Sequence, residues 1–197
     1  SYSLQNLEKF IRKRQTKAFL INKPKIIFIG DYHKSKRPFL TRMFGFGFLK
    51  LAVDDIFNNS TLSENIDQHK AVFTSRPDRN LLMLLDIWKN KIYSKNSKNK
   101  LYITPSKVAS NFYNYNVFSR DMLDQKDYLN NIKNSRLMLI PGHKAELFCL
   151  AAEEARELCI PIVTLGIGSL SERVDHNITG LIAKDKSQFA EYTIKLF

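Results

Sequence analysis

Two glutamates eight positions apart, Glu146 and Glu154, lie in the segment HKAELFCLAAEEAR and could act together on a ligand. A carboxylate accepts two hydrogen bonds from a pair of neighbouring hydroxyl groups, such as the diol of a ribose. Glu146 falls where the chain turns into a helix, whose first N–H groups would be open to phosphate or hydroxyl oxygens. The alternative is an ordinary charged helix face, because Glu153 and Glu157 accompany Arg156 on the same stretch.

A second loop, TSRPDRN at residues 74–80, places Arg76 and Arg79 on either side of a Pro-Asp turn at the mouth of a helix. Two guanidinium groups and the N–H groups of a helix start would together form a receptor for a diphosphate. In the alternative interpretation, Arg79 is a solvated residue of the first helical turn and Arg76 pairs with Asp78.

Glycines mark two further segments. In LGIGSLSERVDHNITGLIA (165–183), Gly166 and Gly168 would let the backbone approach a ligand, and Glu172 could cap or bind. The aromatic stretch FGFGF (44–48) is predicted to be a loop or packed turn rather than a phosphate loop. A phosphate loop requires a strand immediately before it, and none is predicted there.

The sequence offers little for metal binding or nucleophilic catalysis. The four histidines are scattered without ligand spacing. Neither Cys149 nor Cys159 has the local signature of a nucleophile, and two cysteines are too few for a disulfide framework or a zinc site. The pair Asp54 and Asp55 lies inside an apolar helical pattern. We therefore predict no metal and no cofactor.

The elements that would position these loops alternate along the chain from about residue 70. Strands are predicted at 70–75, 101–104, 136–142 and 161–166, and helices at 79–95, 120–135, 145–158 and 186–197. Strands separated by helices predict βαβ units, and hence an α/β protein with a Rossmann-like, doubly wound parallel sheet. Such sheets bind ligands at the carboxyl ends of their strands, which is where the three loops fall.

The first 65 residues are less regular. A basic helix at about residues 4–18 precedes PKIIFIGD, which is predicted to be a buried strand. Polar residues at 60–69 separate two apolar regions, so we expect a basic N-terminal segment at 1–65 and a larger domain at 66–197.

The composition favours a folded protein with anionic partners. Hydrophobic residues make up 44% of the chain, and no apolar run approaches the ~20 residues that a transmembrane helix needs. Charges interrupt the apolar residues of the N-terminus, so we expect no signal peptide. With only two cysteines, a reduced, cytosolic setting is expected. The net charge is +12, and residues 1–65 carry 12 Lys/Arg against 5 Asp/Glu. Such an excess suits phosphates, nucleic acid or an acidic lipid surface without choosing among them.

Taken in order, the three loops resemble the C-terminal half of a GT-B-fold retaining glycosyltransferase of family 4, also called group 1. In that family a glutamate precedes a Gly-Phe-Gly loop, and a second glutamate followed by alanine stands eight positions after the first. Here ELFCLAAEEA supplies Glu146, Phe148, Glu154 and Ala155 in register. FTSRPDRNLLMLLDIW is similar to the first strand and helix of that domain, and CIPIVTLGIGSLSERVDHNITGLIA to its later strand and glycine loop. The resemblance covers roughly residues 66–197.

The resemblance implies transfer of a hexosyl or related sugar from a nucleotide-diphosphate sugar to a saccharide or lipid-linked acceptor, with retention and without a metal. Such transfer builds polysaccharides, lipopolysaccharides or glycolipids. The catalytic residues would be Arg76, Arg79 and Glu146, and the donor-binding residues Leu147, Phe148, Cys149, Leu150 and Glu154. The arginines would neutralise the departing diphosphate, Glu146 would hold the donor sugar, and Glu154 would bind the ribose.

Two departures from the family pattern keep other functions open. Leu147 and Cys149 replace both loop glycines, and residues 1–65 are too short for the family's N-terminal acceptor domain, so we interpret them as a remnant of it. The chain could therefore be a catalytically degenerate nucleotide-binding or scaffolding module. Nothing resembling a nucleic-acid recognition module accompanies the charge, so no specific nucleic acid is expected. The basic start could instead contact the inner face of an anionic membrane.

Overall fold

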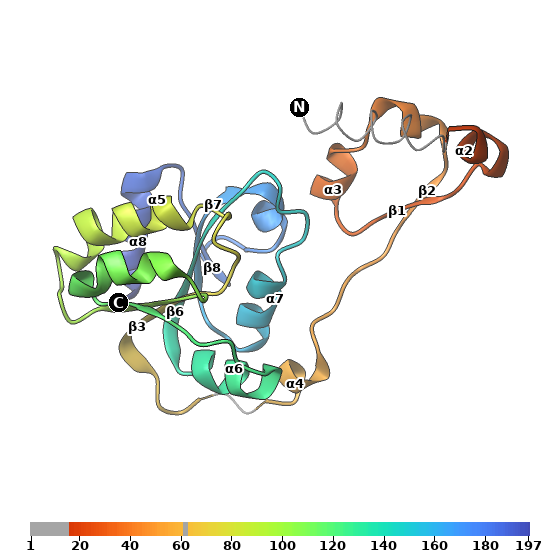
Figure 1. The fold of residues 1–197 in the computed structure, drawn as a ribbon. Coiled ribbons are helices and arrows are strands. Elements are labelled where there is room, and N and C mark those ends of the chain that lie inside the picture. Colours follow the sequence, from red (N-terminus) through yellow and green to blue (C-terminus); the bar gives the residue numbers. More distant parts are fainter. Residues whose placement is uncertain (1–15, 61–62) are drawn as a thin grey trace. The chain divides into compact units, whose positions relative to one another are not determined.

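The computed structural model describes residues 16–60 and 63–197, and the chain divides into two compact units, Ser1–Leu51 and Ala52–Phe197 (Figure 1). The division falls between Leu51 and Ala52, nearer the N-terminus than the boundary we expected at residues 60–69. Most of the basic helix expected at residues 4–18 lies outside the described residues.

The C-terminal unit is built on a six-stranded, fully parallel sheet with the order β5-β4-β3-β6-β7-β8. Its strands are β3 (Asp67–Phe73), β4 (Lys100–Ile103), β5 (Val117–Ser119), β6 (Ser135–Gly142), β7 (Ile162–Ile167) and β8 (Gly180–Ile182). The chain starts centrally with β3, moves outwards to β5, and returns to place β6 on the other side of β3. This order confirms the predicted doubly wound α/β fold and creates a switch point between β3 and β6.

Helices cover both faces of this sheet, as Figure 1 shows. One face carries α5 (Leu81–Ile87), its π-helical continuation η2 (Trp88–Tyr93) and α8 (Lys186–Leu196). The other face carries α4 (Asp55–Asn58), α6 (Gln125–Ile132) and α7 (Leu150–Glu157). Two 3-10 helices, η3 (Lys107–Tyr115) and η4 (Gly168–Glu172), lie in the connections. Because both faces are covered, the central strands are apolar on both sides.

Two apolar clusters fix the helices to the sheet. Trp88 is fully buried in the first cluster, and its indole N–H donates a hydrogen bond of 2.8 Å to the Tyr115 carbonyl. Truncating such a side chain to alanine costs about 3–5 kcal/mol. In the second cluster, Ala152 and Ala155 are fully buried. These small residues let α7 lie close to the sheet, which fixes the position of Glu154 between them in the sequence.

Two short strands were not predicted, and two helices begin later than predicted, at Gln125 and at Leu150. β5 and β8 have three residues each, too few for a periodic pattern to emerge. The helix expected at 120–135 begins only at Gln125. Asp124 caps it, because its carboxylate accepts a hydrogen bond of 2.8 Å from the N–H of Asp127.

The described part of the N-terminal unit holds short elements around a two-stranded parallel sheet. These are α2 (Thr16–Asn22), β1 (Ile26–Phe28), α3 (Asp31–Ser35), the 3-10 helix η1 (Phe39–Met43) and β2 (Phe46–Phe48). The prediction of a loop or turn at 44–48 is therefore wrong. Phe46 and Phe48 alternate with glycine at the two-residue period of a strand, and Phe28 packs against both rings. The predicted strand in PKIIFIGD is present, but Ile27 is 49% exposed, so it is not buried on both sides.

Candidate functional site

An ion pair joins the loops that follow β3 and β6, at the switch point of the sheet. The Nε of Arg79 lies 3.1 Å from the Oε2 of Glu146, and both side chains are mostly buried, with 15% and 21% exposure. The two residues are 67 positions apart in the sequence. The carboxyl ends of parallel strands meet at one edge of the sheet, and this order of strands brings the two loops together there.

Asn80 ties the first of these loops to the end of β6. Its backbone adopts the left-handed conformation, with φ at 65°, directly before α5 begins at Leu81. Its side-chain amide donates a hydrogen bond to the carbonyl of Gly142. Asparagine tolerates this conformation better than most residues, because its short amide can bond locally. The turn that carries Arg79 is thereby held against the neighbouring strand.

His143 contributes an acceptor beside Arg79. The Nη1 of Arg79 lies 3.4 Å from the Nδ1 of His143, and the N–H of Ala145 donates to the same nitrogen at 3.1 Å. A nitrogen that faces two donors must be unprotonated, so the proton of the neutral ring is assigned to Nε2. Sequence reasoning set His143 aside as a scattered histidine. It joins the site only because β6 ends next to β3.

The two arginines of the TSRPDRN loop have different environments. Arg76 forms a two-point ion pair with Asp78, at 3.1 and 2.8 Å, and its side chain is 74% exposed. The alternative interpretation is thus confirmed for Arg76 but wrong for Arg79, which is mostly buried and bonded to Glu146. An exposed pair contributes little stability, typically ~0–1 kcal/mol. The Oδ2 of Asp78 also lies 3.2 Å from the Nη1 of Arg79, so Arg76 joins the ion-pair cluster only through Asp78, at its exposed edge.

Gly168 holds the loop that carries Glu146. Its φ is +81°, and a β-carbon added there would lie 2.4 Å from the carbonyl oxygen of His143. The next N–H, of Ser169, donates a hydrogen bond of 3.0 Å to the Glu146 carbonyl. The sequence suggested that this glycine lets the backbone approach a ligand. In the structure it lets η4 approach the backbone of the 143–146 loop.

Cys149 interrupts the predicted helix at 145–158, which begins only at Leu150. Its backbone is left-handed, with φ 64° and ψ 77°, a conformation that costs a non-glycine residue of order 1–3 kcal/mol. The chain thus keeps at Cys149 a conformation that favours glycine, the residue that the family pattern has there. Burial, with the nearby carboxylate of Glu146, raises the pKa of the Cys149 thiol to about 12, so the thiol is neutral at physiological pH.

The other residues of this loop take different positions. The ring of Phe148 is buried and lies 4.0 Å from the guanidinium of Arg173. Leu147 is partly buried, and Leu150 is half exposed at the start of α7. Within residues 147–150, Cys149 is the residue with a positive φ. Leu147 therefore replaces its glycine without such a backbone.

Glu154 belongs to a partly buried polar cluster rather than to the solvated face of α7. Its Oε2 accepts a hydrogen bond of 2.7 Å from the hydroxyl of Tyr128 on α6. Burial raises the pKa of Glu154, while Tyr128 and Arg120 act in the opposite direction. Glu153 is mostly buried as well and pairs with Arg156 and Arg173, each at 3.1 Å, so only Arg156 and Glu157 are exposed as the alternative expected.

Two residues of this cluster, Tyr128 and Arg120, were missed by the sequence analysis. Arg120 follows β5 directly, is 8% exposed, and has its guanidinium carbon 5.2 Å from the centroid of the Tyr128 ring. A cation at this distance from an aromatic face is attracted to it. Since β5 itself was not predicted, an arginine at its carboxyl end carried no signal. Recognising VFS as a strand would have placed Arg120 beside the other loops.

The arrangement offers cations for an anion and acceptors for hydroxyl groups along one edge of the sheet. Arg79 and the backbone around His143 lie at the switch point, and Glu154 and Arg120 lie towards β5. Within residues 16–60 and 63–197, no group of three or more His, Cys, Asp or Glu side chains is placed to hold a metal ion.

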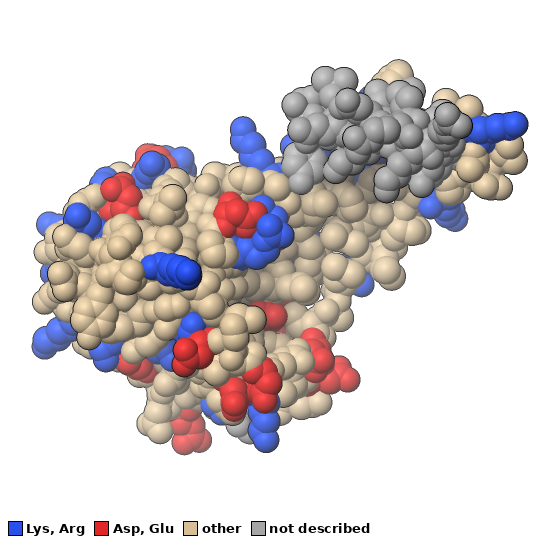
Figure 2. All heavy atoms as spheres, viewed as in Figure 1, with Lys and Arg blue, Asp and Glu red and all other residues tan. Residues whose placement is uncertain are grey.

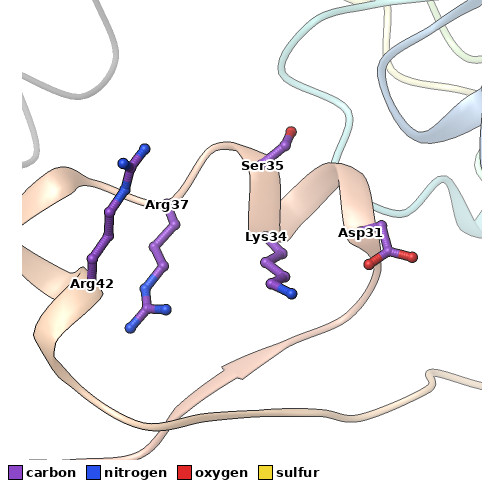
Figure 3. Close-up of a pocket in the computed structure, with 5 residues that line it drawn as sticks. All are labelled: Asp31, Lys34, Ser35, Arg37 and Arg42. Carbon is purple, nitrogen blue, oxygen red and sulfur yellow. The ribbon is translucent and has the colours of Figure 1, made fainter.

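A separate hollow of about 460 Å³ occurs in the N-terminal unit, lined by Asp31, Lys34, Ser35, Arg37 and Arg42 (Figure 3). Figure 3 shows the side chains of Lys34 and Arg37 extending to one side, while the guanidinium of Arg42 points the other way. Arg37 donates to the backbone carbonyls of Thr41 and Phe44. The three cationic groups do not converge, so the hollow lacks the geometry of a site for one anion.

Comparison with known proteins identifies the fold of the chain. No protein-family model matches the sequence, and no curated protein is similar to it at the level of sequence. Solved structures of GT-B glycosyltransferases, however, superpose on 87% of the chain. The fold is that of a GT-B C-terminal domain.

Three of these structures illustrate the likeness. A mutant of TarM from S. aureus, solved with UDP, fondaparinux and alpha-GlcNAc-glycerol, matches with a TM-score of 0.69 at 16% identity. The pneumococcal O-GlcNAc transferase GtfA, solved with UDP and GlcNAc, matches with a TM-score of 0.66 at 13% identity. Sucrose-phosphate synthase from Thermosynechococcus elongatus matches with a TM-score of 0.66 at 13% identity. The chain spans 36%, 38% and 48% of the length of these three proteins, respectively.

Proposed function

We propose that this chain is the donor-binding part of a retaining glycosyltransferase of family 4, which transfers a hexosyl or related sugar from a nucleotide-diphosphate sugar. The acceptor is a saccharide or a lipid-linked molecule, in the synthesis of a polysaccharide, lipopolysaccharide or glycolipid. The Arg79–Glu146 pair at the switch point carries the proposal, because it places a cation and a carboxylate where doubly wound sheets bind ligands.

Arg79 is proposed to bind the diphosphate and to stabilise the charge that develops on it as the sugar departs. A guanidinium forms charge-assisted, two-point hydrogen bonds with phosphate oxygens, and such fixed electrostatic groups often supply the largest part of catalysis. Its present partners, Glu146 and Asp78, hold it in place with little freedom. Arg76, which is exposed and pairs with Asp78 in the same loop, is proposed to contact the same diphosphate.

Glu146 is proposed to accept hydrogen bonds from hydroxyl groups of the donor sugar. When phosphate oxygens replace the carboxylate as partners of Arg79, the Glu146 oxygen that faces Arg79 becomes available to the sugar. The backbone at Leu147, Phe148, Cys149 and Leu150 would line the same subsite. Because Arg79 supplies the compensating charge, we propose that transfer needs no metal.

Glu154 is proposed to bind the ribose of the nucleotide. Its Oε2 accepts from Tyr128, which fixes the orientation of the carboxylate. A carboxylate has about four acceptor positions, so Tyr128 leaves enough for a pair of ribose hydroxyl groups.

The N-terminal unit is proposed to contact an anionic membrane, on the cytoplasmic side, where a lipid-linked acceptor would be presented. Residues 1–51 carry 12 Lys/Arg against 2 Asp/Glu, whereas residues 52–197 carry 19 against 17. Figure 2 shows acidic and basic side chains interspersed on the visible face of the C-terminal unit. In residues 16–60 and 63–197, none of the helices has the length and apolarity that a bilayer crossing requires. A peripheral contact would instead combine basic and apolar side chains.

Exposed apolar side chains of the N-terminal unit favour this contact. Among the residues of this unit whose side chains the structure describes, nine large ones are at least 39% exposed: Leu20, Ile21, Ile27, Phe39, Met43, Phe46, Phe48, Leu49 and Leu51. In a flotation assay, vesicles that contain phosphatidylglycerol should carry the protein, and pure phosphatidylcholine vesicles should not. The double variant Phe39→Ser, Met43→Ser should release it, whereas Lys98→Glu in the C-terminal unit should not. Equal binding to both kinds of vesicle would contradict a role for the charge.

A non-catalytic nucleotide-binding module is the second candidate, favoured by Leu147 and Cys149 in place of glycines. The two candidates differ in turnover rather than in binding. The test is calorimetric titration with UDP, GDP and their sugars, followed by a radiolabel transfer assay on saccharide and lipid-linked acceptors. Binding with transfer supports the enzyme, and binding without transfer on any acceptor supports the module. If neither the nucleotides nor their sugars bind, both candidates fail.

A further inference from the structure

Arg120 is a buried arginine whose hydrogen-bonding groups the fold leaves incompletely used. It is 8% exposed, and its Nε is buried without a hydrogen-bond partner among residues 16–60 and 63–197. In the same part of the chain it forms no ion pair with an acidic side chain, although Glu154 is close enough to act on it electrostatically. A buried cation without such partners lowers the stability of the fold, so we looked for a ligand that its N–H groups could bind.

The position of Arg120 continues the line of groups that the proposed donor would occupy. Cys149, which precedes the helix that carries Glu154, is close enough to both Glu146 and Glu154 for each carboxylate to act on it electrostatically. Glu154 in turn bonds to Tyr128, whose ring faces Arg120. β5 is separated from β3 by β4, and all three strands end at the same edge. From the switch point towards β5, the order of groups is thus Arg79, Glu154 and Arg120.

This order matches the order of parts in a nucleoside diphosphate, which runs from diphosphate through ribose to base. Arg79 would bind the diphosphate, Glu154 would bind the ribose, and Arg120 would lie next to the base. A guanidinium carries five N–H donors and no acceptor. It can therefore bond to a base that presents a carbonyl oxygen, such as uracil or guanine. Adenine has no carbonyl oxygen: where guanine carries this oxygen, adenine carries an amino group, which cannot accept. Its ring nitrogens can accept, so the discrimination requires the guanidinium to be held against the position of the carbonyl oxygen.

We propose that Arg120 is a specificity-determining residue, which donates hydrogen bonds to a carbonyl oxygen of the donor's base and so selects uracil or guanine over adenine. This inference rests on the proposed function, since it concerns the nucleotide that the same site would bind. The ring of Tyr128 supports the guanidinium from one side, and the carboxylate of Glu154 keeps a negative charge nearby. Both contacts orient the guanidinium of Arg120, and neither accepts a hydrogen bond from its Nε–H.

The test compares Arg120→Met with a matched control, Arg136→Met, in the full chain. Methionine keeps an unbranched apolar stem and removes every donor. Arg136 is also partly buried, but its Nε already donates a hydrogen bond of 2.6 Å to the carbonyl of Leu196. It lies near the start of β6, whereas the proposed site lies at the carboxyl ends of the strands. UDP, GDP, ADP and inorganic pyrophosphate are titrated by calorimetry into each protein. Thermal unfolding of each protein alone is measured in parallel.

The wild type is expected to bind UDP or GDP more tightly than ADP. Arg120→Met should weaken the preferred nucleotide about tenfold, leave pyrophosphate unchanged, and abolish the preference over ADP. Arg120→Lys, which keeps the charge but not the planar fork, should recover part of the preference. Arg136→Met should retain the full preference and lower the melting temperature more than Arg120→Met does.

Two results would overturn the inference, and they differ from failure of the proposed function. If Arg120→Met keeps the wild-type preference among the nucleotides, Arg120 does not read the base. If that variant also unfolds at a clearly lower temperature than Arg136→Met, Arg120 is a packing residue. If the wild type itself binds neither pyrophosphate nor any nucleotide, the proposed function fails, and the inference fails with it.

Discussion

Arg79 and Glu146 contact each other across the switch point of the sheet, with the guanidinium Nε 3.1 Å from the carboxylate Oε2. The pair links the loop after the first strand of the C-terminal unit to the loop after the fourth. Neither side chain is a free surface charge, and each holds the other in the place where doubly wound sheets bind ligands. The predictions below follow from this pair and from the residues that support it.

The backbone of Cys149 predicts an unequal response to two small substitutions. Cys149→Ala and Cys149→Val both remove the thiol, but valine is β-branched and strongly disfavours φ near +64°. We expect Cys149→Val to lower the free energy of unfolding by about 1–3 kcal/mol more than Cys149→Ala. Urea denaturation followed by circular dichroism measures the difference. Equal losses for the two variants would show that this backbone can relax.

The close approach of Gly168 predicts that a single methyl group disturbs the site. Gly168→Ala places a β-carbon 2.4 Å from the His143 carbonyl, so the 143–146 loop must shift. We expect a loss of roughly 2–4 kcal/mol in unfolding free energy, the range of severe single substitutions. Gly45→Ala is the control, because its β-carbon would meet an ordinary contact at 3.8 Å. A Gly168→Ala protein as stable as Gly45→Ala would contradict the described contact.

The two cysteines should differ in reactivity towards maleimide. Cys149 is buried, and burial raises its pKa to about 12, whereas Cys159 is exposed. The thiolate is the reactive form, so only Cys159 should be modified quickly in the folded protein at neutral pH. Mass spectrometry of digested protein identifies the modified residue, and labelling in urea should reveal Cys149. Rapid modification of Cys149 in the folded protein would contradict its described burial.

Glu154 predicts a pH-dependent difference between the wild type and Glu154→Gln. Burial raises the pKa of this carboxyl above its usual 4.5, so the folded state binds its proton more tightly than the unfolded state does. The stability that this proton provides is present below pH 4.5 and is lost as pH rises through the folded-state pKa. Glutamine stays neutral and can still accept from Tyr128. Glu154→Gln should therefore gain stability relative to the wild type as pH rises from about 4 to 7.

Melting temperatures of the two proteins, recorded across this range, measure the effect. Glu157→Gln, on an exposed part of the same helix, serves as the control and should show a smaller difference. A Glu154→Gln protein that loses stability relative to the wild type with rising pH would mean that ionised Glu154 stabilises the fold.

The sequence predicted the parts of this site that belong to local patterns. Alternating strands and helices indicated the doubly wound sheet, and the motifs around Arg79 and Glu146 lie in loops that the structure brings together. The roles of Asn80 and His143 could not be predicted, because each depends on contacts between segments more than 60 residues apart. The Tyr128–Glu154 bond spans 26 residues and likewise leaves no local signal.

In the N-terminal unit, residue types alone led to a wrong prediction. FGFGF contains a strand, although its glycines favoured a turn, because aromatic packing onto Phe28 outweighs the low strand preference of glycine. Leu147 and Cys149 both replace glycines of the family pattern. In the structure only Cys149 has the left-handed backbone, a distinction that residue types alone cannot reveal.

The central claim, that the C-terminal unit binds a nucleotide diphosphate through Arg79, is tested most directly by calorimetry. UDP, GDP and pyrophosphate are titrated into the wild type, Arg79→Ala and Lys98→Ala, the last being an exposed cation elsewhere in the same unit. We expect saturable binding to the wild type and to Lys98→Ala. In Arg79→Ala, the affinity for the nucleotide and for pyrophosphate should fall about 10–100-fold, the effect of removing hydrogen bonds to a charged group. Unchanged affinity in Arg79→Ala, or no binding to the wild type, would contradict the role of Arg79.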